Sequence, residues 1–188
     1  MKIDRRTIKT RHLIKRAFTD IVHEKPINKI TVKEIANLAG VNRSTFYQHF
    51  KDVYEVHEAV LEDFATEFIR LFRERGYQYH KEDTERSLRG LINYMQDNEK
   101  IFKILVRHDE SVLVDKMSRK LIYYAKESKY EGYVRNPEQF VCAVYFLMHG
   151  IIGLLKKWFD QELDYFLAEV GNLIYTFIIN GFVLRNQH

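Results

Sequence analysis

Hydrophobic residues recur every three or four positions along most of this chain, which is the spacing of amphipathic helices. Ile14 and Phe18 belong to the first such stripe, which predicts a helix over residues 5–24. Lys25-Pro26 ends this helix, because the residue before a proline is pushed out of the α region. Similar stripes predict longer helices farther along, over about residues 52–75, 82–97, 99–107, 109–130, 137–159 and 162–183.

Two shorter helices are predicted between the first helix and the first long one. Thr31 and Glu34 have the spacing of a capping box, so a helix begins there. It ends at Gly40, which can take the left-handed conformation that a helix terminus favours. Asn42 then caps a second short helix that starts at Arg43. Only three residues separate the two helices, which suits helices that cross at a steep angle.

The whole pattern predicts an all-α protein of about nine helices, since no segment alternates with the period of a strand. Three N-terminal helices would form a helix-turn-helix domain over residues 1–52, which extends into the helix over 52–75. The other helices would form a C-terminal helical bundle over residues 53–188. The joint between the domains is expected along the first long helix, not in a separate linker.

The longest apolar run, FVCAVYFLMHGIIGLL, covers residues 140–155. It contains His149 and is shorter than the roughly 18 to 20 residues of a membrane span, so we expect a buried helix. Cys142 is the only cysteine, which excludes an internal disulfide and favours a buried core thiol. The first residues are charged and no apolar stretch follows them. We therefore expect no signal peptide and a cytoplasmic location.

The net charge of +4 is unevenly distributed along the chain. Residues 1–50 hold eleven Lys/Arg and four Asp/Glu, or +7, whereas the other 138 residues hold 19 and 22, or −3. An apolar share of 46% with 30% charged residues is ordinary for a globular protein. A basic head on a nearly neutral body is typical of polyanion binding, although a solvated face without a partner would look the same.

The segment GVNRSTFYQHF, residues 40–50, combines apolar anchors with many polar side chains. Phe46 and Phe50 are four residues apart and share one helix face, with Val41 beside them. The remaining side chains of this helix face outward: Arg43, Ser44, Thr45, Tyr47, Gln48 and His49. Taken singly, each is more often a packed or solvated residue. As a set on one short helix in the basic third, they indicate DNA binding.

Each residue type in that set has a partner on DNA. An α-helix fits the major groove, where arginine pairs with guanine and glutamine with adenine. Tyrosine and histidine typically hold phosphate oxygens, which position a helix without reading sequence. The start of the supporting helix at Thr31 offers a hydroxyl and N–H groups to an anion. Lys33, Lys51 and the cluster Arg5, Arg6 and Lys9 would add attraction to phosphate that weakens with salt.

The stretch ITVKEIANLAGVNRSTFYQHFKDVYEV resembles the helix-turn-helix of TetR/AcrR-type transcriptional regulators, over about residues 8–60. The resemblance implies an all-helical homodimer, most often a repressor, with an effector pocket in its C-terminal body. It places Arg43, Ser44, Thr45 and Gln48 at base-facing positions. It places Thr31, Tyr47, His49 and Lys51 at or near phosphates. Asn42 stands where the family often has serine, and both residues cap helices well.

The C-terminal helices suggest a dimer interface and a pocket. A helix that is apolar nearly all round is covered on more than one side, and Gly150 and Gly153 would let a partner helix approach. With the last helix it would form half of a four-helix bundle about a two-fold axis, unless it is the central helix of a monomer. The expected interface residues are Phe140, Val144, Gly150, Gly153, Leu154, Trp158, Leu173 and Phe177. The candidate effector pocket comprises Tyr94, Phe102, Tyr123, Tyr124, Tyr145 and Met148, although an aromatic set at helical spacing is more often core than a ligand site.

These observations favour a dimeric repressor of a palindromic operator, released from DNA by a small-molecule effector. One alternative is a DNA-binding co-regulator that is controlled by a protein partner in place of a ligand. Another is an enzyme or small-molecule binding protein with an incidental head, but no nucleophile–base pair or phosphate-binding glycine loop supports it. We expect no cofactor and no metal. His108, Asp109 and Glu110 are contiguous and would fan around a helix end.

Overall fold

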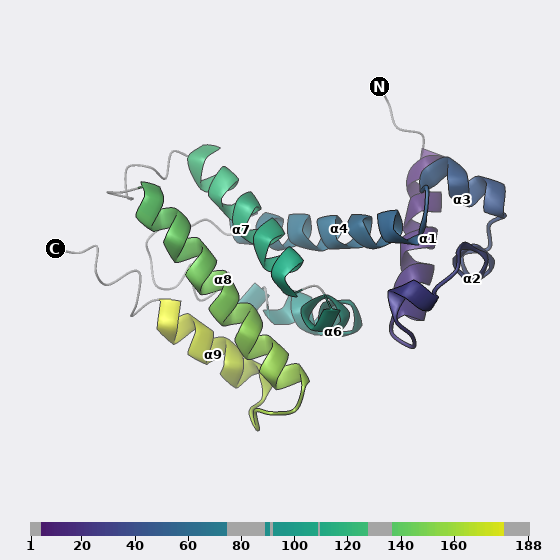
Figure 1. Cartoon of the computed structure of the whole chain (residues 1–188). Coiled ribbons are helices and arrows are strands. Elements are labelled where there is room, and N and C mark those ends of the chain that lie inside the picture. The colour runs from purple at the N-terminus through teal and green to yellow at the C-terminus, as the bar shows by residue number, and fades with distance from the viewer. Residues whose placement is uncertain (1–4, 75–88, 91, 109, 128–136, 179–188) are drawn as a thin grey trace. The chain divides into compact units, whose positions relative to one another are not determined.

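The computed structural model is built of helices (Figure 1). It describes residues 5–74, 89–90, 92–108, 110–127 and 137–178. Over these residues there is no strand, and the all-α fold predicted from the sequence is confirmed. The helices are α1 (Arg5–Val22), α2 (Val32–Leu38), α3 (Arg43–His49), α4 (Val53–Glu74), α6 (Glu99–His108), α7 (Glu110–Glu127), α8 (Pro137–Phe159) and α9 (Leu167–Ile178), with a 3-10 turn, η1 (Ile27–Lys29).

The chain divides into two compact units, Met1–Asp63 and Phe64–His188. The boundary between them falls within α4, which contributes its first half to one unit and its second half to the other. The compact units are not the same as the functional domains. The division into a DNA-binding domain over residues 1–52 and an effector-binding and dimerisation domain over residues 53–188 stays a prediction. Each unit has its own hydrophobic core and is described by itself below.

In the first unit, α2 and α3 pack against α1 and against each other (Figure 1). Their inner faces form the core with the start of α4. Its fully buried side chains are Ile14, Phe18, Ile35, Phe46, Phe50, Val56 and Leu61. Lys15 of α1 forms an ion pair with Asp63 of α4, and Lys25 forms one with Glu34 of α2. An ion pair from α1 therefore contacts α4, and an ion pair from the connection after α1 contacts α2.

The turn between α2 and α3 has the predicted local chemistry. Thr31 and Glu34 form the capping box at the start of α2. Gly40 has φ +68°, in the left-handed region that favours glycine. The N–H of Val41 reaches back to the carbonyl of Ala36 at 2.9 Å, which closes the end of α2. The chain then re-enters a helix at Asn42 within two residues, so the direction of α3 is set locally.

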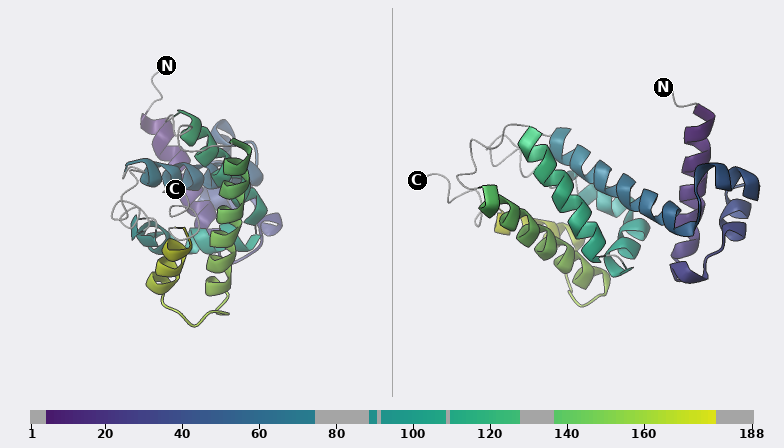
Figure 2. Two further views of the ribbon diagram at one scale, coloured as in Figure 1. Left: turned by 90° about the vertical axis from the view of Figure 1, so that its left-hand side faces the viewer. Right: turned by 45° about the horizontal axis from the view of Figure 1, so that its top comes forward.

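In the second unit, α8 packs against α6, α7 and α9. Figure 2 shows α8, in green, and α9, in yellow, side by side. The ring of Phe102 lies 5.2 Å from that of Phe64 and 5.5 Å from that of Phe159. One face of α8 supplies a continuous buried stripe of Val144, Met148, Ile152, Leu155 and Phe159. Lys156 of α8 bonds Glu110 of α7 at 2.7 Å, which joins the ends of these helices.

Several predicted helix limits differ from those in the structure. The first helix ends at Val22, two residues early, and the last begins at Leu167 instead of residue 162. Gln161, with φ of 60°, lies in the turn that follows the end of α8 at Phe159. Glu169 then caps α9 by accepting the N–H of Phe166 at 2.7 Å. Pro137 does open α8, while half of the predicted helix over 82–97 and residues 179–183 of the last one lie outside the described residues.

Among the described helices, α8 is long and apolar enough to cross a membrane by length and composition alone. That test is weak evidence, because a core helix of a soluble protein passes it too. Only 22% of its apolar window is buried inside the structure. The prediction that Cys142 is a buried thiol is wrong, since it lies on the open face of this helix. Sequence hydropathy identified the helix as apolar but could not show that only one face meets its own core.

Candidate nucleic-acid interface

Helix α3 presents two faces with different roles. Phe46 and Phe50 are buried to 0% and 1% exposure, and their rings lie 6.1 Å apart in the core of the first unit. The side chain of Asn42 accepts the N–H of Thr45 at 2.7 Å and so caps the helix as expected. The helix is therefore held at its start by a cap and along one side by two phenylalanines.

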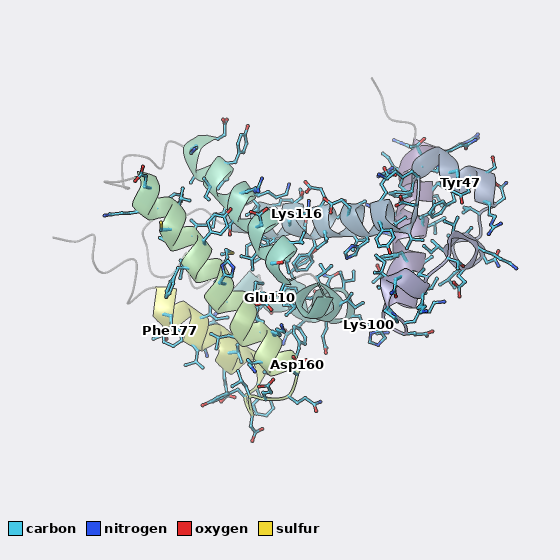
Figure 3. The ribbon with its side chains drawn as sticks, in the orientation of Figure 1. Tyr47, Lys100, Glu110, Lys116, Asp160 and Phe177 are labelled. Atoms are coloured by element: carbon cyan, nitrogen blue, oxygen red, sulfur yellow. The ribbon has the colours of Figure 1, made fainter. Side chains whose placement is uncertain are left out.

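The opposite face of α3 is polar and open. Arg43, Ser44 and Gln48 are exposed, and Thr45 and His49 are partly exposed. Tyr47, labelled in Figure 3, is 56% exposed although its ring meets the edge of Phe46. All the residues of this helix that were predicted to meet bases or phosphates are thus at least partly exposed, while Phe46 is buried. A row of donors on an anchored helix is the arrangement that can enter a DNA groove.

Arg11 of α1 holds the C-terminal end of α3, a role that the sequence did not reveal. Its Nη1 donates to the carbonyl oxygen of His49 at 2.7 Å. Its guanidinium carbon also lies 4.1 Å from the centre of the Phe50 ring. In the sequence, Arg11 is one of eleven cations in the first fifty residues, and no local spacing links it to a helix 38 residues away.

The cations of the basic head differ in how far their side chains are exposed. Arg11, Lys15 and Lys25 each bond to another element of the unit. The hydrogen bonds from Lys25 and Thr31 lower the pKa of Glu34 from 4.5 to about 2, so this carboxylate stays ionised at neutral pH. The described cations whose side chains are exposed are Arg5, Arg6, Lys9, Arg16, Lys29, Lys33, Arg43 and Lys51. These carry the positive field toward solvent.

Thr31 is exposed, but the structure already engages the groups that were expected to meet phosphate. Its hydroxyl donates to Glu34 Oε2 at 2.7 Å, and its backbone N–H donates to the same oxygen at 2.9 Å. A carboxylate in this position competes with a phosphate oxygen for the same donors. A phosphate contact by Thr31 stays a prediction, and it requires Glu34 to share or yield these hydrogens. Lys33 and Lys51 are exposed, and the backbone N–H of Lys51 donates to Glu55 Oε2 at 2.6 Å.

The open face of α8 is apolar in the single protomer. Phe146 is 77% exposed, and a Cβ added at Gly150 or Gly153 would meet no atom within 4 Å. On α9, Leu173 and Phe177, the latter labelled in Figure 3, are exposed as well. The other expected interface residues, Phe140, Leu154 and Trp158, are partly exposed.

Val144 is a correction to the expected interface. It belongs to the buried stripe of α8 and is 4% exposed, so it packs within its own unit. Phe146, which the sequence analysis did not single out, lies on the open face instead. The two positions are half a helical turn apart, and hydropathy alone does not distinguish them. Cys142, Phe146, Gly150 and Gly153 recur at helical spacing and define this open face.

The residues proposed for an effector pocket differ in how deeply they are buried, and the pocket stays a prediction. Tyr94 and Phe102 each stack with Phe64, at 5.4 and 5.2 Å, in the core of the second unit. Met148 is buried in the α8 stripe, and Tyr124 is half-buried. Tyr123 is 66% exposed and so does not line the interior of its own protomer.

Tyr145 lies in a polar cluster between α7 and α8. Its hydroxyl donates to Asp115 at 3.0 Å, and Arg119 bonds the same carboxylate. Burial and the bond to Asp115 raise the pKa of Tyr145, while the bond from Arg119 lowers the pKa of Asp115. Within the described part of the chain, no group of three or more His, Cys, Asp or Glu side chains could hold a metal ion. Asp109, one member of the contiguous run considered above, lies outside that part.

Comparisons with known proteins agree with this geometry. The family model described as bacterial regulatory proteins, tetR family, matches residues 19–60, from the second half of α1 into α4. The helix-turn-helix-type transcriptional regulator YxbF of Bacillus subtilis is 32% identical over 69 residues. This match covers 36% of the chain and 18% of YxbF, so the chain matches less than a fifth of that relative's length.

Solved structures match over nearly the whole chain. A TetR transcriptional regulator from Streptococcus agalactiae is 26% identical with a TM-score of 0.63, covering 93% of this chain and 96% of its own. A TetR-family regulator from Syntrophomonas wolfei has a TM-score of 0.71 at 18% identity, covering 90% and 93%. FadR from Bacillus subtilis, solved in complex with stearoyl-CoA, has a TM-score of 0.64 at 14% identity, covering 90% and 98%. At such identities the last two show a shared fold.

Proposed function

Because the chain belongs to the TetR family of bacterial regulatory proteins, we propose that it is a homodimeric, sequence-specific DNA-binding transcriptional repressor. The family match confirms the resemblance seen in the sequence and identifies a regulator, not an enzyme. The observation that carries the proposal is the division of α3, where Phe46 and Phe50 are buried while Arg43 and Gln48 are exposed. Such a helix is rigidly held and free to meet base edges.

The open face of α8 and α9 supports the dimer. An apolar surface is left open by the exposed side chains of Phe146 and Phe177 and by the free space at Gly153. In a monomer this surface would be in contact with water, whereas in a dimer another protein surface would cover it. A second copy related by a two-fold axis would bury this face against itself. It would also supply the second recognition helix that a palindromic operator requires, with half-sites about one DNA turn apart.

We propose that a small-molecule effector bound in the second unit controls DNA affinity. FadR, which shares this fold, was solved with stearoyl-CoA, so the fold can hold a small molecule. The aromatic residues around Phe102 and the polar group of Tyr145 are the places in the second unit where such a ligand would find stacking and hydrogen-bonding partners. Native mass spectrometry of the purified dimer tests for a retained ligand. Its removal should change DNA affinity if the ligand is an effector.

DNA selectivity tests the main proposal. The purified protein is used to select duplexes from a randomised library, and the bound sequences are determined. We expect a two-fold symmetric consensus with half-sites about ten base pairs apart. Recovery of unrelated sequences would reject sequence-specific binding. A cytoplasmic location belongs to the same proposal, since the operator would lie on the bacterial chromosome.

A further inference from the structure

Arg11 combines two contacts with the end of α3 that are unusual for a cation in a DNA-binding head. Its Nη1 donates to the carbonyl oxygen of His49 at 2.7 Å, and its guanidinium lies 4.1 Å from the centre of the Phe50 ring. The side chain is only partly exposed, unlike that of its neighbour Lys9. The two contacts come from one planar group and meet two consecutive residues of the chain.

The physical chemistry of these contacts explains why an arginine stands here. The last four carbonyls of a helix lack a partner within the helix, and His49 is the final residue of α3. A positive charge at this end is also favoured by the helix dipole. The flat guanidinium can donate along its edge while its face covers an aromatic ring, which a lysine ammonium cannot reproduce. Arg11 therefore fixes both the backbone end of α3 and its second anchor.

A short helix makes this restraint important. α3 has seven residues and is about 10 Å long, so a small rotation at one end moves the side chains along its whole length. Bidentate contacts of arginine or glutamine with a base depend strictly on geometry. Contacts of a flexible lysine with phosphate tolerate more displacement, because the ammonium acts as a point charge.

We propose that Arg11 is a positioning residue for DNA recognition, which holds α3 so that Arg43 and Gln48 meet the bases, and that it is not a phosphate contact. This inference rests on the proposed function, since it concerns the selectivity of the same interface. It separates the partly exposed Arg11 from the exposed cations of α1, although all of them belong to the basic first fifty residues of the chain.

The experiment compares Arg11→Gln, Arg11→Lys and the matched control Lys9→Gln with the wild-type protein. The probes are the duplex that the wild type selects from a randomised library and a shuffled duplex of the same composition. Affinities for both are measured at several salt concentrations, which gives the selectivity ratio and the slope of log affinity against log salt. Circular dichroism and thermal melting show that each variant is folded at the working temperature.

A positioning role predicts that Arg11→Gln lowers the selectivity ratio by about tenfold and leaves the salt slope unchanged. Arg11→Lys, which keeps the charge, should lose selectivity as well, to a smaller degree. Lys9→Gln should leave the selectivity ratio unchanged, whatever it does to the slope. If Arg11→Gln is unfolded at the working temperature, the ratio for Arg11→Lys decides.

Two results would overturn the inference. An equal loss on both duplexes with a slope reduced by about 0.9 would make Arg11 a phosphate contact. Unchanged selectivity in both Arg11 variants would show that α3 does not need this anchor. A wild-type protein that does not discriminate between the duplexes would reject the proposed function itself, and the role of Arg11 with it.

Discussion

Phe46 and Tyr47 are consecutive residues whose rings lie 5.6 Å apart with their planes at 87°, yet one is buried to 0% exposure and the other is 56% exposed. The pair marks the line along α3 where the protein core ends and the outward face begins. The exposed Tyr47 ring is supported by its T-shaped contact with the buried Phe46 ring. The proposed contact of the Tyr47 hydroxyl with a DNA phosphate depends on that support.

Tyr47→Phe removes the hydroxyl and keeps the ring contact with Phe46. We expect it to weaken binding to every duplex by a similar factor, because a phosphate contact carries no sequence information. Protein stability should change by less than about 0.5 kcal/mol, as for other exposed sites. Parallel titrations of a selected and a shuffled duplex provide the measurement. A loss confined to the selected duplex would mean that Tyr47 touches a base.

Arg43→Ala and Gln48→Ala remove the two side chains best suited to read bases. Each substitution should weaken the free energy of binding to the selected duplex by about 1 to 3 kcal/mol. It should also relax the base preference at one position of each half-site. Repeating the library selection with each variant identifies that position. Equal losses on selected and random DNA would contradict a base-reading role, and would make the residue a general electrostatic contact.

Gly153→Glu places a charge on the open face of α8, where the added Cβ meets no atom of its own protomer. The protomer should therefore fold normally, while a dimer formed through this face would have to bury an unpaired carboxylate. Light scattering should show the mass falling from two chains to one. Ser111→Glu, at an exposed position of α7, is the control and should keep the wild-type mass. A dimeric Gly153→Glu variant would place the interface elsewhere.

Glu34 makes the stability of the first unit depend on pH at the acid end. Its pKa is lowered from 4.5 to about 2, chiefly by the hydrogen bond from Lys25 and then by that from Thr31. The stabilisation is complete above pH 4.5 and is lost as the pH falls toward 2. The wild type should exceed Glu34→Gln in unfolding free energy at pH 7, and the gap should close over that window. Urea unfolding at each pH measures the difference in unfolding free energy between the two proteins. A difference that stays constant with pH would show that the Glu34 carboxylate does not cause the pH dependence.

The N-terminal unit could largely be predicted because its determinants are local. The capping box at Thr31, the left-handed Gly40 and the cap at Asn42 each act over three or four residues, so the sequence alone places α2 and α3. The separation of Phe46 from Tyr47 follows from helical periodicity in the same way. What could not be predicted was Arg11, because its contact with His49 depends on how two distant helices pack.

The C-terminal unit shows the limits of periodicity in an apolar helix. Val144 and Phe146 are both hydrophobic, but only tertiary packing decides that the first is buried and the second open. The same ambiguity led to the wrong prediction for Cys142. The start of α9 was placed too early, at residue 162, whereas Glu169 accepts the N–H of Phe166 and the helix begins at Leu167.

The central claim is that α3 reads DNA sequence from a dimeric protein, and the ratio of affinities for selected and shuffled duplexes tests it most directly. Both affinities are measured on the full chain at several salt concentrations. The account predicts a selectivity of at least about a thousandfold at physiological salt, with both affinities falling steeply as salt rises. Equal affinity for the two duplexes, or no binding to either at low salt, would contradict it.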